Sequence, residues 1–227
     1  MKIYPVEFSI VIVGQDCNPT ILNPDFLLRH NIVPEDWGWR LAAPPITTSP
    51  FATVAYDSGV TVRVEVNRFQ VTDNRTVEDI ATSKAGDIAH RYIEVLPHVR
   101  YTAVGINFRS LIEMEDPNLL LKQRFLKSGP WDQEARCLQE LSLTLAYRYD
   151  QGRFILSLES ATVTLPMGDQ LGQKRGVLAS ANFHRDCPDY PSMAQVTEHL
   201  GHATQDADYF QTTLTDLFTE VNQASTE

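Results

Sequence analysis

The stretch Phe51–Asn67, with the sequence FATVAYDSGVTVRVEVN, decides the fold class of this chain. From Val60 to Val66, valine occupies every second position and polar residues lie between, which is the period of a half-buried β-strand. The residues before Asp57 alternate in the same way, and Asp57-Ser58-Gly59 has the composition of a tight turn. The stretch therefore predicts a β-hairpin with one buried face and one polar face that is exposed or functional.

Other segments have the same alternation of apolar and polar residues. They are Val6–Val13, Tyr101–Phe108, Leu141–Tyr149 with its return Phe154–Leu158 after the turn Asp150-Gln151-Gly152, and Val177–Phe183 after an expected polar loop at Gly168–Gly176. Successive strands joined by short turns form antiparallel sheets. After Asn67 the apolar positions change parity, so we expect a β-bulge or bend near Arg68. Ala103 and Gly105 share one side of their strand, where we expect a bulky element such as a helix or the tryptophans to lie.

A central helix is expected at about residues 76–96. Thr76 and Asp79 form a capping-box pattern, and apolar residues recur at helical spacing from there until Pro97. One face of this helix is expected to cover the sheet.

A long C-terminal helix or helix pair is expected at about residues 191–222. Apolar residues from Met193 to Val221 step by alternating threes and fours, as in an a/d heptad, and Gly201 is a candidate break. Two interpretations stay open: the stripe packs on the sheet of its own subunit, or it forms a helix-helix dimer seam. Under the second interpretation, Phe210 is a candidate binding residue.

These elements predict an α+β fold with a largely antiparallel sheet built from hairpins and covered by the two helical regions. The chain has 227 residues, of which 43% are hydrophobic and 21% charged, as is usual for a globular protein. We expect a single domain over residues 1–222 and a disordered tail at residues 223–227.

Charge and cysteine content limit the partners and the compartment. A formal net charge of −10 argues against nucleic acid and anionic membranes, because both bind through lysine and arginine. Cys17, Cys137 and Cys187 are odd in number and widely spaced, which favours reduced thiols in the cytoplasm. No apolar segment reaches the roughly 18 to 20 residues that span a bilayer. The sequence therefore predicts a soluble cytoplasmic protein.

Two tryptophans and two charged residues are candidate binding residues. Trp37 and Trp39 lie in a proline-rich, irregular stretch, where they either plug the sheet edge or form a platform on which a ligand stacks. Arg63 and Glu65 lie on the polar face of the predicted hairpin.

One candidate metal site and one candidate nucleophile pair stand out in the second half of the chain. His199, His202 and Asp206 are spaced so that helical geometry places them on one side, as a His-His-carboxylate set for zinc or iron. Solvated surface histidines are the alternative. His184 and Cys187 point to opposite faces if their strand continues, so a polar strand end is favoured over a Cys-His nucleophile pair.

The sequence contains no GxGxxG, GxxxxGK[ST], GxSxG or HExxH motif. Our first hypothesis is therefore a non-catalytic binding or assembly module that contacts a protein partner or a second copy of itself, as a dimer or larger oligomer. The alternative is a metal-assisted hydrolase that uses His199, His202 and Asp206. No cofactor is predicted beyond the divalent metal of that alternative.

The chain resembles an uncharacterised, sporadically distributed bacterial protein family. The resemblance lies in Val66-Asn67-Arg68-Phe69 at the end of a strand, a helix, and Gly105-Ile106-Asn107-Phe108-Arg109 in the next strand. Asn107 and Phe108 stand where the family tends to have arginine and tyrosine. The resemblance implies the architecture and no activity.

Overall fold

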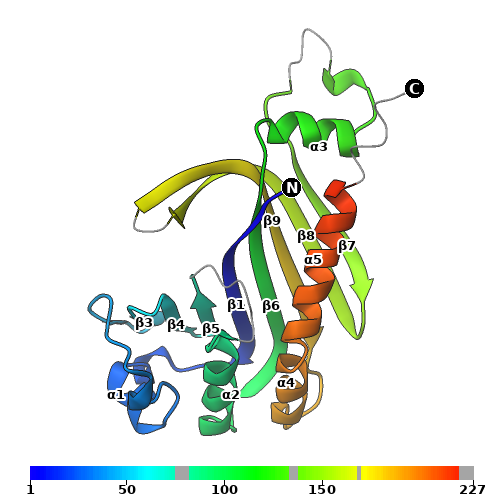
Figure 1. Ribbon diagram of the computed structural model, residues 1–227. Helices are drawn as coiled ribbons and strands as arrows, with labels where there is room; N and C mark the ends of the chain where they lie inside the picture. The colour runs from blue at the N-terminus through cyan, green and yellow to red at the C-terminus, as the bar shows by residue number, and fades with distance from the viewer. Residues whose placement is uncertain (75–81, 133–137, 168–169, 220–227) are drawn as a thin grey trace.

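The computed structural model describes residues 1–74, 82–132, 138–167 and 170–219. All nine described strands form one antiparallel sheet in the order β2-β3-β4-β5-β1-β6-β9-β8-β7 (Figure 1). The strands are β1 (Ile3–Gln15), β2 (Ile46–Thr47), β3 (Phe51–Ala55), β4 (Val60–Glu65), β5 (Arg68–Asp73), β6 (Arg100–Glu113), β7 (Ser142–Tyr149), β8 (Gly152–Met167) and β9 (Gln170–Asp186). The predicted α+β class and antiparallel sheet are confirmed.

The sequence FATVAYDSGVTVRVEVN forms the predicted hairpin, as β3 and β4. Of the two alternatives expected near Arg68, the bulge is wrong and the chain bends, because it reverses at Val66 and Asn67 and returns as β5 in register with β4. The change of parity after Asn67 therefore marks a second tight turn. Val64 and Phe69 are direct cross-strand partners, and both are buried.

Strands β8 and β9 are longer than the apolar alternation predicts. The polar loop expected at Gly168–Gly176 is wrong for its described part, because β9 begins at Gln170 and pairs with β8 from there to His184. A strand that curves away from the core can contain polar and small side chains, so these residues do not end β8 or β9.

Five α-helices lie among the described residues: α1 (Pro24–Arg29), α2 (Ala85–Val95), α3 (Pro117–Phe125), α4 (Met193–Leu200) and α5 (Ala203–Thr219). The central helix begins at Ala85, because Thr82 to Lys84 are not α-helical, and the predicted cap at Thr76 lies outside the described residues. The Ser83 hydroxyl accepts a hydrogen bond from the Ala85 N–H at 3.3 Å, which satisfies one free donor at this helix end.

Helices α2, α4 and α5 cover one face of the sheet, which we call the covered face (Figure 1). Ring stacking connects the two layers: Phe69 of β5 lies 3.9 Å from Tyr92 of α2, between ring centroids. The core residues of the strands alternate with residues on the opposite, open face, so a single face of the sheet holds almost all of the apolar burial.

The C-terminal region is a helix pair, with the break at Gly201 and His202. Its apolar stripe faces the sheet of the same chain, where Phe210 is 1% exposed and stacks on Phe108 at 5.9 Å. A dimer seam through Phe210 is therefore contradicted, because the ring is already covered by its own sheet. The heptad spacing of the apolar residues is compatible with packing on the chain's own sheet and with packing on a second helix.

The far ends of β8 and β9 curl back over the open face. Leu165, near the end of β8, forms a small second cluster with Leu111 of β6 and Leu178 of β9. The curl explains how a face without helices buries these side chains.

Truncation of Phe210 tests the packing of α5. Phe210→Ala is expected to lower the free energy of unfolding by about 3–5 kcal/mol, since it removes a buried ring from a tightly packed layer. The measurement is chemical denaturation, and Gln211→Ala, one residue away and exposed, is the control and should stay within about 0.5 kcal/mol. If Phe210→Ala changed the oligomer mass without loss of stability, the dimer interpretation of the helix would be supported instead.

Candidate functional site

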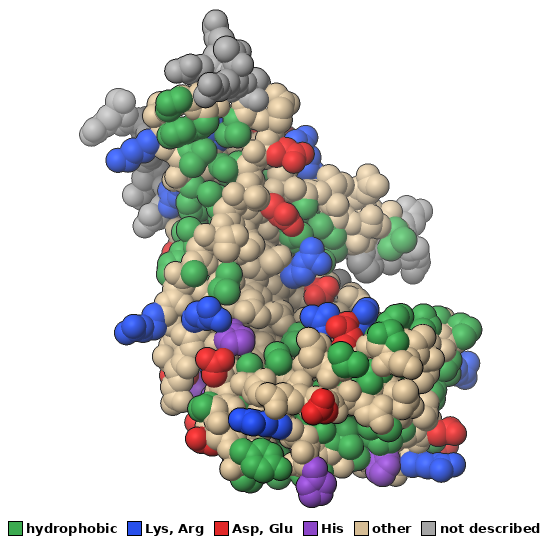
Figure 2. Space-filling view, turned by 180° about the vertical axis from the view of Figure 1, so that it is seen from behind, with side chains coloured by type: hydrophobic (Ala, Val, Ile, Leu, Met, Phe, Trp, Pro, Cys, Tyr) green, Lys and Arg blue, Asp and Glu red, His purple; other side chains and the backbone are tan. Residues whose placement is uncertain are grey.

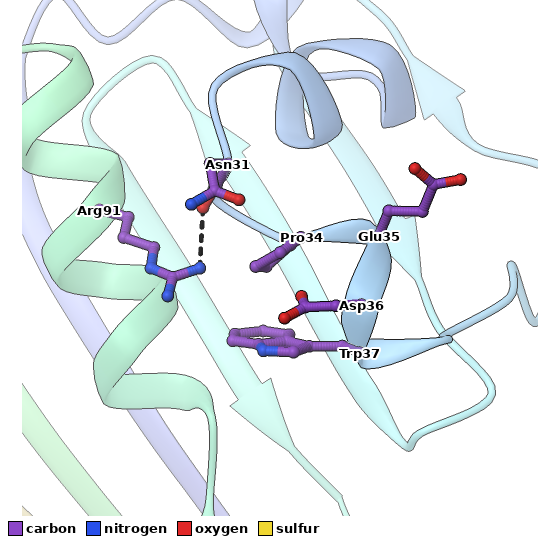
Figure 3. A pocket seen from close by; sticks show the side chains of 6 residues that line it. All are labelled: Asn31, Pro34, Glu35, Asp36, Trp37 and Arg91. Carbon is purple, nitrogen blue, oxygen red and sulfur yellow. Dashed lines mark hydrogen bonds between the residues drawn. The ribbon is translucent and has the colours of Figure 1, made fainter.

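The predicted tryptophans lie on the covered face, beside α2. Trp37 belongs to the 3₁₀ turn η2 (Glu35–Trp37) and borders a shallow hollow of about 540 Å³ with Asn31, Pro34 and Arg91 (Figure 3). Arg91 extends from α2 into this hollow and donates a hydrogen bond to the Asn31 carbonyl at 2.9 Å.

Side chains of the same chain already contact the Trp37 ring. The Arg91 guanidinium carbon lies 5.2 Å from the ring centroid, and the Lys84 ammonium lies 5.5 Å from it. Trp39 lies 4.8 Å from Trp37 and 5.6 Å from Tyr56 of the β3–β4 turn. These contacts fasten the proline-rich stretch to α2 and the sheet, which favours the interpretation of the tryptophans as a plug.

Arg63 and Glu65 lie on the open face, so the predicted binding residues do not form one site. Glu65 Oε1 accepts from Arg63 Nε at 2.8 Å and from Arg68 Nη2 at 3.0 Å. The hydrogen bond from Arg68 lowers the pKa of Glu65, and the charge of Arg63 acts in the same direction. Exposed ion pairs of this kind add little stability.

The predicted metal ligands are not arranged around a common point. Both carboxylate oxygens of Asp206 accept from Arg185, at 2.8 and 2.6 Å, and the two side chains are 0% and 2% exposed. His199 Nε2 lies 3.3 Å from the Asp186 carbonyl, and its ring centroid is 6.4 Å from that of His202. Within the described residues, no group of three histidine, cysteine or carboxylate side chains is placed to hold a metal ion.

Arg185 is the residue that sequence reasoning missed. It follows Val177, Ala179, Ala181 and Phe183 at the same parity of β9, so the alternation itself placed it on the covered face. Burial alone disfavours its charge, but the hydrogen bonds and charge of Asp206 outweigh that effect and raise the pKa of Arg185. A guanidinium held against both oxygens of Asp206 competes directly with a divalent cation there.

Cys187 lies on the covered face while His184 lies on the open face, as strand geometry predicted. Burial raises the pKa of Cys187 to about 11, and the thiol is 3% exposed. The His184 ring instead lies beside Asp186, at 3.1 Å from Nε2 to Oδ1. These two residues therefore lack the geometry of a nucleophile and its base.

The open face is polar along its centre. Ser9, Asn107 and Asn182 are cross-strand neighbours, and Asn182 Nδ2 donates to Asn107 Oδ1 at 2.6 Å. A Cβ at Gly105 would lie 3.2 Å from Asn182 Nδ2, so the glycine leaves room for this amide pair. The helix and the tryptophans that were expected beside Ala103 and Gly105 lie on the covered face instead. Figure 2 shows this face, hollowed between the curled end of β8 and β9 and the strands β3 to β5.

No protein-family model matches the chain, and no curated protein sequence matches it. The fold defines a class: an α+β protein with a nine-stranded antiparallel sheet covered by helices on one face. Among the described residues, no helix is both long and apolar enough to cross a membrane. The resemblance to a sporadic bacterial family stays a prediction.

The buried ion pair can be tested on helix α5. Asp206→Ala should lower the free energy of unfolding by about 3–5 kcal/mol, because it leaves the Arg185 charge buried without a partner. Asp208→Ala changes an exposed aspartate of the same helix and should cost less than about 0.5 kcal/mol. Thermal and urea unfolding give both values. Equal, small effects would mean that the pair does not hold α5 to β9.

Proposed function

We propose that this protein is a non-catalytic, cytoplasmic assembly module that forms a homodimer through edge strand β7. The observation that carries the proposal is the outer edge of β7, which pairs with no other strand among the described residues and has β8 as its one neighbour there. An exposed strand edge is a template for another strand, because its backbone groups are ready to pair. Cys17 and Cys187 are both unpaired thiols, in agreement with a reducing compartment.

The turn between β7 and β8 determines which backbone groups are free. Tyr149 and Gly152 pair directly across the two turn residues, so they exchange both backbone hydrogen bonds, and every second pair along the hairpin does the same. The N–H and C=O groups of Thr144, Ala146 and Arg148 consequently point away from β8. They form a regular row of donors and acceptors.

Strand β7 lacks the features that usually protect an edge. Its sequence, SLTLAYRY, contains no proline, glycine or lysine, and Arg148 is its one charged residue. The opposite edge of the sheet is β2, which has two residues. A short edge strand offers few pairing groups, so β7 is the favoured side for assembly.

A second copy is a suitable partner because β7 is complementary to itself. In an antiparallel pair centred on Ala146, Thr144 of one copy faces Arg148 of the other and Leu145 faces Tyr147, so no like charges are opposed. Tyr147 is 38% exposed, and Leu143 and Leu145 are half-buried. Pairing would shield this apolar row, which β7 by itself leaves at the edge of the core.

Ala146→Pro tests the proposal. Proline removes the outward N–H of residue 146 without removing a bond to β8, so the hairpin should persist while the dimer loses two central hydrogen bonds. The dimer dissociation constant should rise on the order of 30-fold, at about 1 kcal/mol per bond. Light scattering and sedimentation across a concentration series measure it.

Ala146→Val is the matched control, since valine keeps the N–H and has a high strand preference. It should leave the dissociation constant within about threefold. A wild-type protein that is monomeric at all concentrations, or a dimer equally stable in both variants, would contradict pairing through β7.

A further inference from the structure

Three basic side chains form one row across the open face, at the end of the sheet where β7 turns into β8. Arg148 is the cross-strand partner of Arg153, and Arg153 is the cross-strand partner of His184. Partners across adjacent strands point to the same side, and their Cβ atoms are roughly 4.5–5.5 Å apart. The side chains of Arg148, Arg153 and His184 therefore start from neighbouring positions on the same face of the sheet.

The two arginines have no acidic partner among the described residues. No ion pair or side-chain hydrogen bond of the described part of the chain includes Arg148 or Arg153, although the chain carries 29 acidic residues. Like charges in direct cross-strand contact are destabilising. The row therefore contains two neighbouring positive charges that no acidic side chain of the described residues neutralises.

A shallow hollow of about 460 Å³ opens at this row. Arg148, Arg153, His184 and two aspartates line it, together with the turn backbone at Gln151 and Gly152. This volume falls in the range of about 300–1,000 Å³ that small-molecule sites occupy.

Each of the two aspartates of the hollow has a basic neighbour other than the two arginines. Asp150 Oδ2 lies 3.9 Å from Arg185 Nε and 3.7 Å from His202 Nδ1, on the side of the covered face. Asp186 contacts His184, and its side chain is 80% exposed, so water and salt screen its charge. The two arginines carry ten N–H donors, and among the described residues no side chain forms a hydrogen bond with them.

We propose that this hollow binds a phosphoryl group, as the free ion or as the monoester of a small molecule. A phosphate presents several acceptor oxygens, which suits two planar guanidinium forks, and its negative charge would remove the repulsion between Arg148 and Arg153. His184 lies next to Arg153 in the row, with its Nε2 atom 3.1 Å from Asp186 Oδ1. The site lies within one chain, so it does not depend on the dimer.

The experiment is calorimetric titration of the full-length protein with inorganic phosphate, glycerol 3-phosphate and glycerol, at constant ionic strength. Saturable binding of either phosphate, with none for glycerol, is expected. Tighter binding of the ester supports a phosphorylated small molecule, and equal binding supports the free ion. Arg153→Gln should raise the dissociation constant at least about tenfold, because it removes a charge-assisted, two-pronged contact.

Arg63→Gln is the matched control. Arg63 lies on the same open face and in the same cross-strand row, but Glu65 already neutralises it, so the dissociation constant should change less than about twofold. Arg153→Lys keeps the charge and loses the fork, and should fall between the two. Unchanged thermal midpoints establish that the variants are folded. No saturable binding up to about 10 mM phosphate, or equal losses in Arg63→Gln and Arg153→Gln, would overturn the site.

Discussion

The burial of one face of a nine-stranded sheet is the constraint on which the rest of this structure depends. Alternate residues of every long strand send their apolar side chains to the same face, and hydrophobic burial requires that face to be covered. Helices α2, α4 and α5 meet this requirement, with Phe210 seated on Phe108. Because these three helices pack on the covered face, they leave the open face and the outer edge of β7 uncovered.

The Arg185–Asp206 pair is the polar exception within the covered layer. Burying both charges is costly, and the two short hydrogen bonds offset that cost only in one alignment of α5 on β9. The pair therefore favours one alignment of α5 on β9 more than it adds to the net stability of the fold. The same engagement removes Asp206 from the predicted His-His-carboxylate set, so no observation favours the metal-assisted hydrolase over the assembly module.

The two proposed surfaces meet at the hairpin of β7 and β8, and both follow from its two-residue turn. The turn aligns Arg148 with Arg153, so the two side chains start from the same face at neighbouring positions. It also turns the backbone groups of Ala146 toward solvent. A shift of register by one residue would move the arginines to the covered face and reverse the free edge. One local element would thus govern both the proposed assembly edge and the proposed anion site.

The sequence by itself determined the β3–β4 and β7–β8 hairpins, the helical C-terminal region and the side of each strand that is buried, because alternation of side chains is a local property of a strand. It did not determine the turn between β4 and β5 or the pairing of β8 and β9 beyond their apolar residues. It also contained the signal for Arg185, whose parity matched the apolar positions. Which elements become neighbours was decided only in the tertiary structure. The heptad stripe could not distinguish its own sheet from a second helix, since both bury the same residues. Likewise, the position of His184 beside Arg153, and of the tryptophans and Arg63 on opposite faces, depends on strand order, which local spacing does not encode.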